Sequence, residues 1–197
     1  GKIMLIHNAV EEITGYKPVN TSNVYKFITV ARLSEEKGID RLIRSVSQLA
    51  IPFQYHIIGE GDKRASLQAL IDQLNLREKV FLSGQKNTPY TGMGNADLML
   101  LGSHYEGFPN SLLEAGARGI PVIAFDAPGG IREIITDGEN GLLVNDGDEK
   151  GFCAAIEKAV QLKFDSSKII AATKKRFSLN TVVARVEELL IELFNKP

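Results

Sequence analysis

Short apolar runs alternate along this chain with longer segments in which apolar residues recur every three or four positions, the spacing of a helix that buries one face. The short runs are residues 27–31, 55–58, 80–82, 98–101, 122–125 and 142–144, and the helical segments are 39–49, 64–74, 110–118, 149–162 and 179–194. The runs are apolar throughout, which is typical of strands covered by helices on both faces. The alternation therefore predicts an α/β fold: a Rossmann-like, three-layer α/β/α domain with a parallel sheet.

The chain divides into a short first segment and one domain. Residues 1–23 combine a brief apolar stretch with Gly15, Pro18 and a polar run, so we expect an interdomain linker or an amino-terminal extension there. Residues 24–197 have the length of one domain, and the 44% of hydrophobic residues suffices for a substantial core. Ligands of an open parallel sheet bind beyond the carboxyl ends of its strands. The loops that follow the strands are therefore the places to look for a site.

Charge and composition exclude several kinds of partner. The 23 basic and 24 acidic residues give a formal charge of −1, so no overall field attracts nucleic acid and an anion site has to be local. Cys153 is the single cysteine, which rules out an internal disulfide and, with three histidines, an ordinary zinc site. Residues 145–148 lack the ligand spacing of a calcium loop and predict a turn and helix cap. No apolar run approaches the roughly 18 residues of a membrane span. We expect a cytoplasmic protein without a bound metal.

Two cations lie close together in the loop after the first predicted strand. They are Arg32 and Lys37, and both could face one anion. A planar guanidinium beside a compact ammonium suits a diphosphate. The alternative is that both cations pair with Glu35, Glu36 or Asp40 on a solvated turn, because weak surface pairs of this kind are common. Spacing alone leaves both interpretations open.

A second candidate loop begins at Glu106, after the predicted strand that ends at residue 101. Pro109 suits the first turn of a helix, and Gly107 allows a ligand to approach the backbone closely. Free amides and the helix dipole together favour an anion at such a helix N-terminus. The amides expected to be free are those of Asn110, Ser111 and Leu112.

Glu114 falls inside the same predicted helix, among apolar residues. A carboxylate without a partner costs free energy to bury, so Glu114 needs donors. The adjacent hydroxyls of a ribose are one candidate, and Arg118, one helical turn further on, is the alternative. Glu106 precedes the helix, so the two carboxylates do not share a helix face and their spacing does not establish an acid and base pair.

The two glutamates, Glu106 and Glu114, are separated by seven residues, with Gly-Phe-Pro after the first. This pattern resembles the signature of the large family of retaining glycosyltransferases with the two-domain GT-B fold, the glycosyl transferases group 1. Other motifs follow in the family's order: Asn8-Ala9-Val10, Val30-Ala31-Arg32-Leu33, Ile58-Gly59-Glu60-Gly61, Val80-Phe81-Leu82-Ser83-Gly84, Gly119-Ile120-Pro121-Val122 and Asn140-Gly141-Leu142-Leu143. Ala9 departs from the pattern, because the family commonly has glycine there.

The resemblance implies that the chain is one half of a GT-B fold, the carboxyl-terminal, donor-binding half. It implies that Arg32 and Lys37 hold the donor diphosphate and act in catalysis. It also implies that Glu106 contacts the transferred sugar as a catalytic residue and that Glu114 binds the ribose. The remaining implied donor-binding residues are Gly59, Gly84, Gln85, Gly107, Phe108, Pro109, Asn110, Ser111 and Leu112, with Gly84 and Gln85 near the base.

The resemblance also implies partners. The donor is a nucleotide-sugar, with UDP the commonest nucleotide among relatives, and no metal or other cofactor is needed. The acceptor, a glycan or a lipid-linked sugar, would bind to an amino-terminal Rossmann domain that precedes this sequence. A full-length enzyme of this kind works in the cytoplasm and can attach peripherally to the cytoplasmic face of a membrane.

Three alternatives compete with this interpretation. A nicotinamide-binding Rossmann domain is suggested by Gly59-Glu60-Gly61 after a strand, but the third glycine of that motif is missing and Asp62 lies where the pyrophosphate would approach. An epimerase of nucleotide-sugars with the same fold would need a catalytic histidine and carboxylates at strand ends. A non-catalytic module that binds nucleotide-sugars is compatible with the same residues.

Overall fold

The computed structural model describes residues 6–10, 23–86, 94–162 and 164–194. Its strands are β1 (Tyr25–Val30), β2 (Phe53–Ile58), β3 (Val80–Leu82), β4 (Leu98–Leu101), β5 (Val122–Phe125) and β6 (Gly141–Val144). Its helices are α1 (Ile39–Ser47), α2 (Arg64–Gln73), α4 (Asn110–Ala117), α5 (Ile131–Ile134), α6 (Glu149–Gln161), α7 (Ser166–Phe177) and α8 (Leu179–Phe194), and a 3-10 turn, η1 (Glu35–Lys37), precedes α1.

The strands form one parallel sheet in the order β3-β2-β1-β4-β5-β6. Strands β2 and β3 follow one another on one side of β1. Strands β4, β5 and β6 follow one another on its other side, so the direction of the strand order reverses between β1 and β4. At the point where the order reverses, the loops after β1 and β4 leave toward opposite faces and open a crevice between them. The predicted parallel α/β sheet is confirmed, and its topology places any ligand site beyond Val30 and Leu101.

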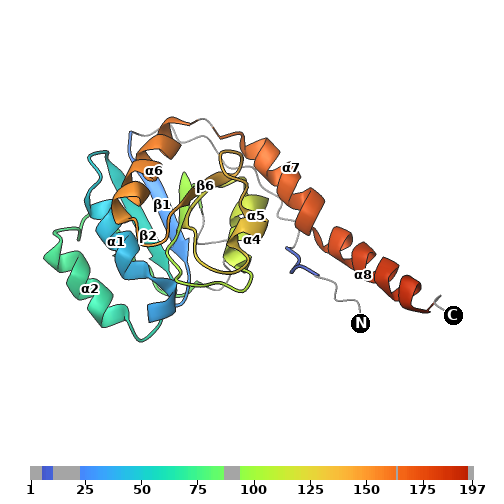
Figure 1. Ribbon diagram of the computed structural model, residues 1–197. Helices are drawn as coiled ribbons and strands as arrows, with labels where there is room; N and C mark the ends of the chain where they lie inside the picture. The colour runs from blue at the N-terminus through green and yellow to red at the C-terminus, as the bar shows by residue number, and fades with distance from the viewer. Residues whose placement is uncertain (1–5, 11–22, 87–93, 163, 195–197) are drawn as a thin grey trace.

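The sheet has a hydrophobic core on each face (Figure 1). Helices α1, α2 and α6 cover one face, where Phe27, Tyr55 and Phe152 are fully buried. Helices α4, α5 and α7 cover the other, where Met99 and Ile131 are fully buried. Because side chains of one strand point alternately to the two faces, each apolar strand contributes to both cores. This confirms the three-layer arrangement predicted from the continuous apolar runs.

The prediction missed helix α7 and placed only two helices after β6. Along α7 the buried residues are Ile169, Thr173 and Phe177, a stripe of one residue per turn whose middle member is polar. Such a narrow stripe gives little helical periodicity in the sequence. A local signal was available, since Asp165 is the N-cap and its side chain accepts hydrogen bonds from the amides of Ser167 and Lys168.

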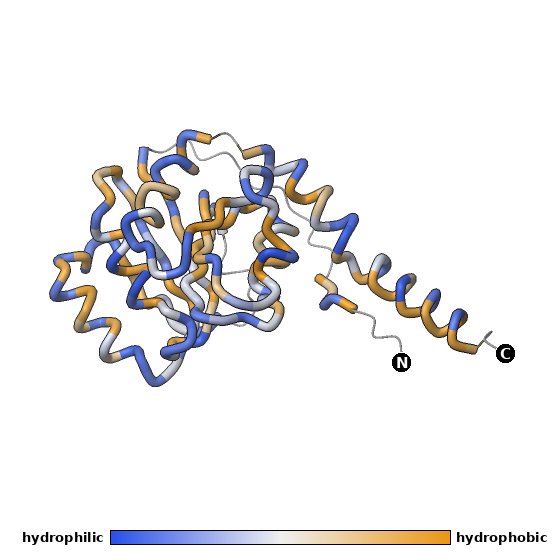
Figure 2. The backbone as a smooth tube through the Cα atoms, in the orientation of Figure 1, coloured by the Kyte–Doolittle hydropathy of each residue, from blue (hydrophilic) through white to orange (hydrophobic). Residues whose placement is uncertain are grey.

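Helix α8 continues from α7 and extends beyond the body of the domain (Figure 1). Apolar and polar residues alternate along it (Figure 2), and Leu190, Ile191 and Phe194 are exposed. No helix in the described ranges has both the length and the apolar character required to cross a bilayer.

Most of the predicted linker or extension, residues 1–5 and 11–22, lies outside the described residues. Of the part that is described, residues 6–10 pack against the domain. The amide of Val10 donates to the carbonyl of Phe177, at 2.8 Å, and Val10 is buried. The boundary at residue 24 stays a prediction.

Candidate functional site

A cavity of about 370 Å³ opens beyond the carboxyl ends of β1 and β4, at the point where the strand order reverses. Residues from both loops and from the start of α4 line it: Val30, Ala31, Lys37, Leu101, Glu106, Phe108, Pro109, Asn110, Ser111 and Glu114. Seven of these ten are residues that the sequence singled out. We call this space the switch-point cavity.

Lys37 and Glu106 meet across this cavity although 69 positions separate them in the chain. The ammonium of Lys37 donates to Oε1 of Glu106 at 2.7 Å, and the hydroxyl of Ser103 donates to the same oxygen at 2.6 Å. Among the described residues none donates to the second oxygen, Oε2. The side chains of Lys37 and Glu106 are 22% and 10% exposed, so the pair is largely shielded from water. The alternative that Lys37 pairs with its neighbours in the η1 turn is wrong, and Glu35 is bonded to Lys63 instead.

The backbone of Glu106 is fixed by the loop after β5. Its amide donates to the carbonyl of Pro128, and its carbonyl accepts from the amide of Gly130 at 3.0 Å. Gly129 has φ of 117°, and a Cβ there would lie 1.6 Å from the carbonyl oxygen of Glu106. Only glycine fits this approach, so residues 128–130 serve to hold Glu106 in place.

Arg41 supports the loop after β4 that leads to Glu106, and the sequence analysis did not identify it. Its guanidinium is buried, donates to the carbonyls of Gly102 and Ser103 and to the carboxylate of Asp146, and lies over the ring of Phe125. A charged residue inside the apolar stripe of α1 was the available signal, because an arginine is rarely buried unless it is paired. Residues 145–148 form the predicted turn and cap, with Asp148 accepting from the amide of Gly151.

The N-terminus of α4 differs in two ways from the prediction. Pro109 is the N-cap residue rather than the first residue of the helix. The amide of Leu112 is not free, because it donates to the carbonyl of Pro109 at 3.0 Å, and the Leu112 side chain is buried. Leu112 is therefore a core residue that cannot offer its amide to a ligand without breaking this bond. Within the described residues, the amides of Asn110 and Ser111 have no acceptor.

Glu114 lines the cavity from the next turn of α4. It is half-buried, and burial raises the pKa of its carboxyl above the ordinary range. No hydrogen bond or ion pair joins it to another described residue, so the predicted alternative of a pair with Arg118 is wrong. The space beside Gly107 is open, because a Cβ on that residue would meet no atom within 4 Å. The cavity thus contains a carboxylate that still lacks donors.

Arg32 lies in an adjoining cavity of about 530 Å³, which shares Val30 and Ala31 with the first. Its other lining residues are Ile58, Gly59, Glu60, Gln85 and Lys86. Arg32 is exposed and has no hydrogen bond or ion pair with a described residue. The two cations of this predicted loop therefore lie in different cavities: Lys37 lines the switch-point cavity, and Arg32 lines the adjoining one.

Gly59 and Gly84 meet beside this second cavity, where the amide of Gly59 donates to the carbonyl of Gly84 at 3.0 Å. A Cβ on Gly59 would lie 1.9 Å from the carbonyl oxygen of Ala31, so packing between two strand ends also requires glycine at this position. Gln85 faces the cavity, whereas Gly84 is not among the lining residues.

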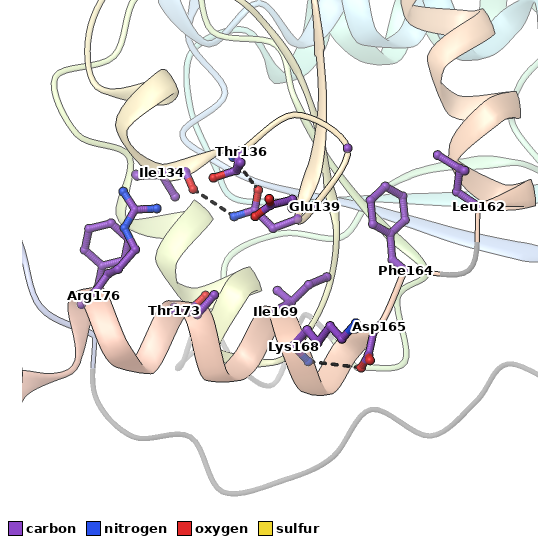
Figure 3. Close-up of a pocket in the computed structure, with 14 residues that line it drawn as sticks. Ile134, Thr136, Glu139, Leu162, Phe164, Asp165, Lys168, Ile169, Thr173 and Arg176 are labelled. Carbon is purple, nitrogen blue, oxygen red and sulfur yellow. Dashed lines mark hydrogen bonds between the residues drawn. The ribbon is translucent and has the colours of Figure 1, made fainter.

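A larger cavity of about 630 Å³ lies near the amino-terminal end of β6, between α7 and the loop that leads into β6 (Figure 3). Several of its polar groups already bond to one another. Asn140, for example, accepts from the amide of Thr136 and donates to the carbonyl of Ile134. None of the residues predicted to bind a ligand lines it.

The described residues contain no group of three or more histidine, cysteine, aspartate or glutamate side chains placed to hold a metal ion. Fold and site together define a Rossmann-like α/β domain of the class that makes up GT-B glycosyltransferases. The chain belongs to the family "Glycosyl transferases group 1", which matches residues 16–176.

Similar proteins agree with this assignment. The chain is 38% identical over 146 residues to an N-acetylgalactosaminyltransferase of Campylobacter jejuni that acts on a diphospho-undecaprenol-linked sugar, covering 73% of this chain and 40% of that protein. The lipopolysaccharide outer core galactosyltransferase WaaB superposes with a TM-score of 0.89 at 27% identity, over 96% of this chain and 55% of WaaB. HepE of Anabaena, solved with UDP, superposes with a TM-score of 0.80 at 25% identity, over 86% of this chain and 49% of HepE. The chain thus spans about half the length of these relatives.

Proposed function

We propose that this chain is the donor-binding half of a retaining glycosyltransferase, which moves a sugar from a nucleotide-sugar to a glycan, lipid-linked or other acceptor. One observation carries the proposal: the pair of Lys37 and Glu106 adjoins two free amides and an unpartnered carboxylate in one cavity at the switch point. An anion with attached hydroxyl groups is the ligand whose chemistry satisfies all of these groups together.

The diphosphate of the donor would lie between Lys37, Arg32 and the amides of Asn110 and Ser111. These groups supply positive charge from two side chains and a helix N-terminus. As the bond between sugar and diphosphate breaks, negative charge grows on the departing phosphate, and preorganised donors of this kind stabilise it. Because protein groups supply this charge, we propose that binding needs no divalent metal.

The hydroxyl groups of the donor would satisfy the two carboxylates. Glu114 accepts from the ribose, which supplies the donors that it lacks. Glu106 accepts from a hydroxyl of the transferred sugar through Oε2, while Ser103 and Lys37 hold Oε1. The base then lies in the adjoining cavity beside Gln85. We propose uracil as the base, because the similar protein HepE binds UDP and UDP-glucose.

In the proposed reaction the bond between the anomeric carbon and the phosphate oxygen breaks first. The acceptor hydroxyl then forms a bond to the anomeric carbon on the face that the phosphate leaves. The hydroxyl proton passes to the departing phosphate oxygen, so the configuration is retained and no protein base is required on this half. The acceptor site would belong to a preceding domain of a longer, cytoplasmic protein that can attach peripherally to a membrane and that builds a polysaccharide.

Calorimetric titration with UDP, GDP and ADP, first without and then with magnesium, tests this proposal. We expect metal-independent binding of UDP that is weakened about tenfold or more by Arg32→Ala and by Lys37→Met, because each removes a charge-assisted contact. The matched control is Arg77→Ala, whose side chain pairs with Asp72 on the surface near the end of α2. Binding that ignores both site substitutions, or that requires magnesium, would contradict the proposal. Sugar transfer by a full-length enzyme, assayed with the same variants, distinguishes a transferase from a module that only binds.

A further inference from the structure

Residues 6–10, which precede the domain, are attached to it next to the junction of α7 and α8 (Figure 1). We call residues 6–10 the clamp segment. His7 lies against two rings: that of Phe108, with centroids 5.0 Å apart, and that of Phe177, with centroids 5.6 Å apart in an edge-on arrangement. Its Nε2 also lies 2.7 Å from Oε2 of Glu133. One imidazole therefore connects the loop before α4, α7 and α5.

The next two positions add further attachments. The side-chain amide of Asn8 donates to Oδ1 of Asn110 at 2.8 Å, and Asn110 is the first residue of α4. Val10 is bonded through its amide to the carbonyl of Phe177 and buried in the core beneath α4 and α7. The clamp segment thus holds both sides of the short stretch from Phe108 to Asn110.

Phe108 is enclosed from a second direction as well. A Cβ on Gly130 would lie 2.9 Å from the Phe108 ring, so the loop after β5 already packs closely against that ring. With His7 against it too, the half-buried ring has little freedom to change rotamer. The backbone that follows it supplies the free amides of Asn110 and Ser111. Neither His7 nor Asn8 lines the switch-point cavity, so neither touches a ligand there.

We propose that His7 and Asn8 are positioning residues, which hold Phe108 and Asn110 so that the first amides of α4 face the donor. The proposal rests on the proposed function, because it assigns these residues to the geometry of the donor site. A displacement of the clamp segment would loosen the Phe108–Asn110 stretch and lower donor affinity without altering any group that contacts the donor.

The test measures the loop and the ligand separately on the same chain. Hydrogen–deuterium exchange without nucleotide reports the two hydrogen-bonded amides that flank the stretch, those of Leu112, which donates to the carbonyl of Pro109, and Gly130, which donates to the carbonyl of Gly107. Calorimetry reports UDP affinity. We expect His7→Ala combined with Asn8→Ala to speed exchange of these amides about tenfold, since each lost contact makes local opening easier. UDP affinity should fall about three- to tenfold, while Arg77→Ala changes neither quantity. In the Asn8→Ala background, His7→Phe in place of His7→Ala preserves the ring contacts with Phe108 and should restore much of the protection and the affinity.

Unchanged exchange of the Leu112 and Gly130 amides in the double variant overturns the proposal. So does faster exchange with unaltered UDP affinity, because the stretch would then be loose without consequence for the donor. If the unsubstituted chain binds no nucleotide but exchange still responds to the double variant, the clamp stands and the proposed function is what fails.

Discussion

Replacing Glu114 with glutamine should stabilise the fold and weaken donor binding at the same time. The carboxylate is half-buried without a described partner, and burial raises its pKa, so the folded chain favours the protonated form. A folded-state pKa above the unfolded value means that the folded chain binds its proton more tightly. The chain therefore loses stability as the pH rises from the ordinary glutamate pKa through the raised one. Glutamine has a similar shape and carries no charge, so the variant does not undergo this loss.

The two effects differ in sign and can be given magnitudes. An unpaired polar group that is fully buried costs about 1–3 kcal/mol, and for half-buried Glu114 the lower end, about 1 kcal/mol, is appropriate. For a chain of this length about 1 kcal/mol corresponds to a rise in Tm of about 2–4 °C. In the complex, a hydrogen bond to a charged acceptor exceeds a neutral one by about 1 kcal/mol, so UDP affinity should fall about fivefold.

Thermal unfolding at pH 4 and pH 7.5 and calorimetric titration with UDP measure both effects. The increase in Tm should be larger at pH 7.5 than at pH 4, because the raised pKa of Glu114 makes the wild-type chain lose stability as the pH rises. Glu187→Gln, on the exposed surface of α8, is the matched control and should change neither quantity. A loss of stability in Glu114→Gln would refute the cost assigned to the half-buried carboxylate. An increase in Tm with unaltered UDP affinity would refute the assignment of Glu114 to the ribose.

Three further single variants and one double variant test the support of the site. Gly129→Ala would place a Cβ 1.6 Å from the carbonyl of Glu106, so the free energy of unfolding in urea should fall by about 2 kcal/mol or more; an unchanged midpoint would mean that the loop accommodates a side chain. Arg41→Met removes a buried, hydrogen-bonded cation. The free energy of unfolding should fall by about 3 kcal/mol, which lowers Tm by about 6–12 °C. A decrease in Tm of less than about 2 °C would contradict the structural role of Arg41. Lys37→Met leaves Glu106 without its cation and should cost about 1–2 kcal/mol. Adding Glu106→Gln should restore Tm but not UDP affinity, and recovery of affinity would argue against a diphosphate at Lys37.

The sequence predicts the elements of this fold well where the pattern is local. The six apolar runs became the six strands, because burial between two helical layers requires apolar residues at every position. Helix α7 was missed because its stripe at Ile169, Thr173 and Phe177 is narrow and partly polar. The loops after β1 and β4, which the sequence predicts to carry the site, both line the switch-point cavity, since parallel strands bring their carboxyl ends to one edge.

The partners of the site residues could not be predicted. Whether Lys37 bonds to Glu35 beside it or to Glu106 across the sheet depends on how the sheet is assembled, and no sequence spacing reports that. The amide of Leu112 looked free by position, but the turn after Pro109 tightens and uses it. The buried role of Arg41 and the attachment of His7 to Phe108 are likewise contacts between distant segments. Family resemblance supplied roles for the loop residues, and the geometry then separated Leu112 from the others.

The bond between Lys37 and Glu106 means that the site supplies its own counter-ion. The ammonium of Lys37 is already neutralised by the carboxylate of Glu106, so a single chloride or phosphate ion gains little by binding there. A diphosphate that attracts Lys37 leaves Glu106 with one donor fewer, and only a ligand that also offers a hydroxyl group replaces it. If the site binds its donor as proposed, this exchange of partners discriminates between the spent nucleotide and the intact nucleotide-sugar. A Glu106→Gln variant that still prefers UDP-glucose to UDP as strongly as the wild type would show that this discrimination arises elsewhere.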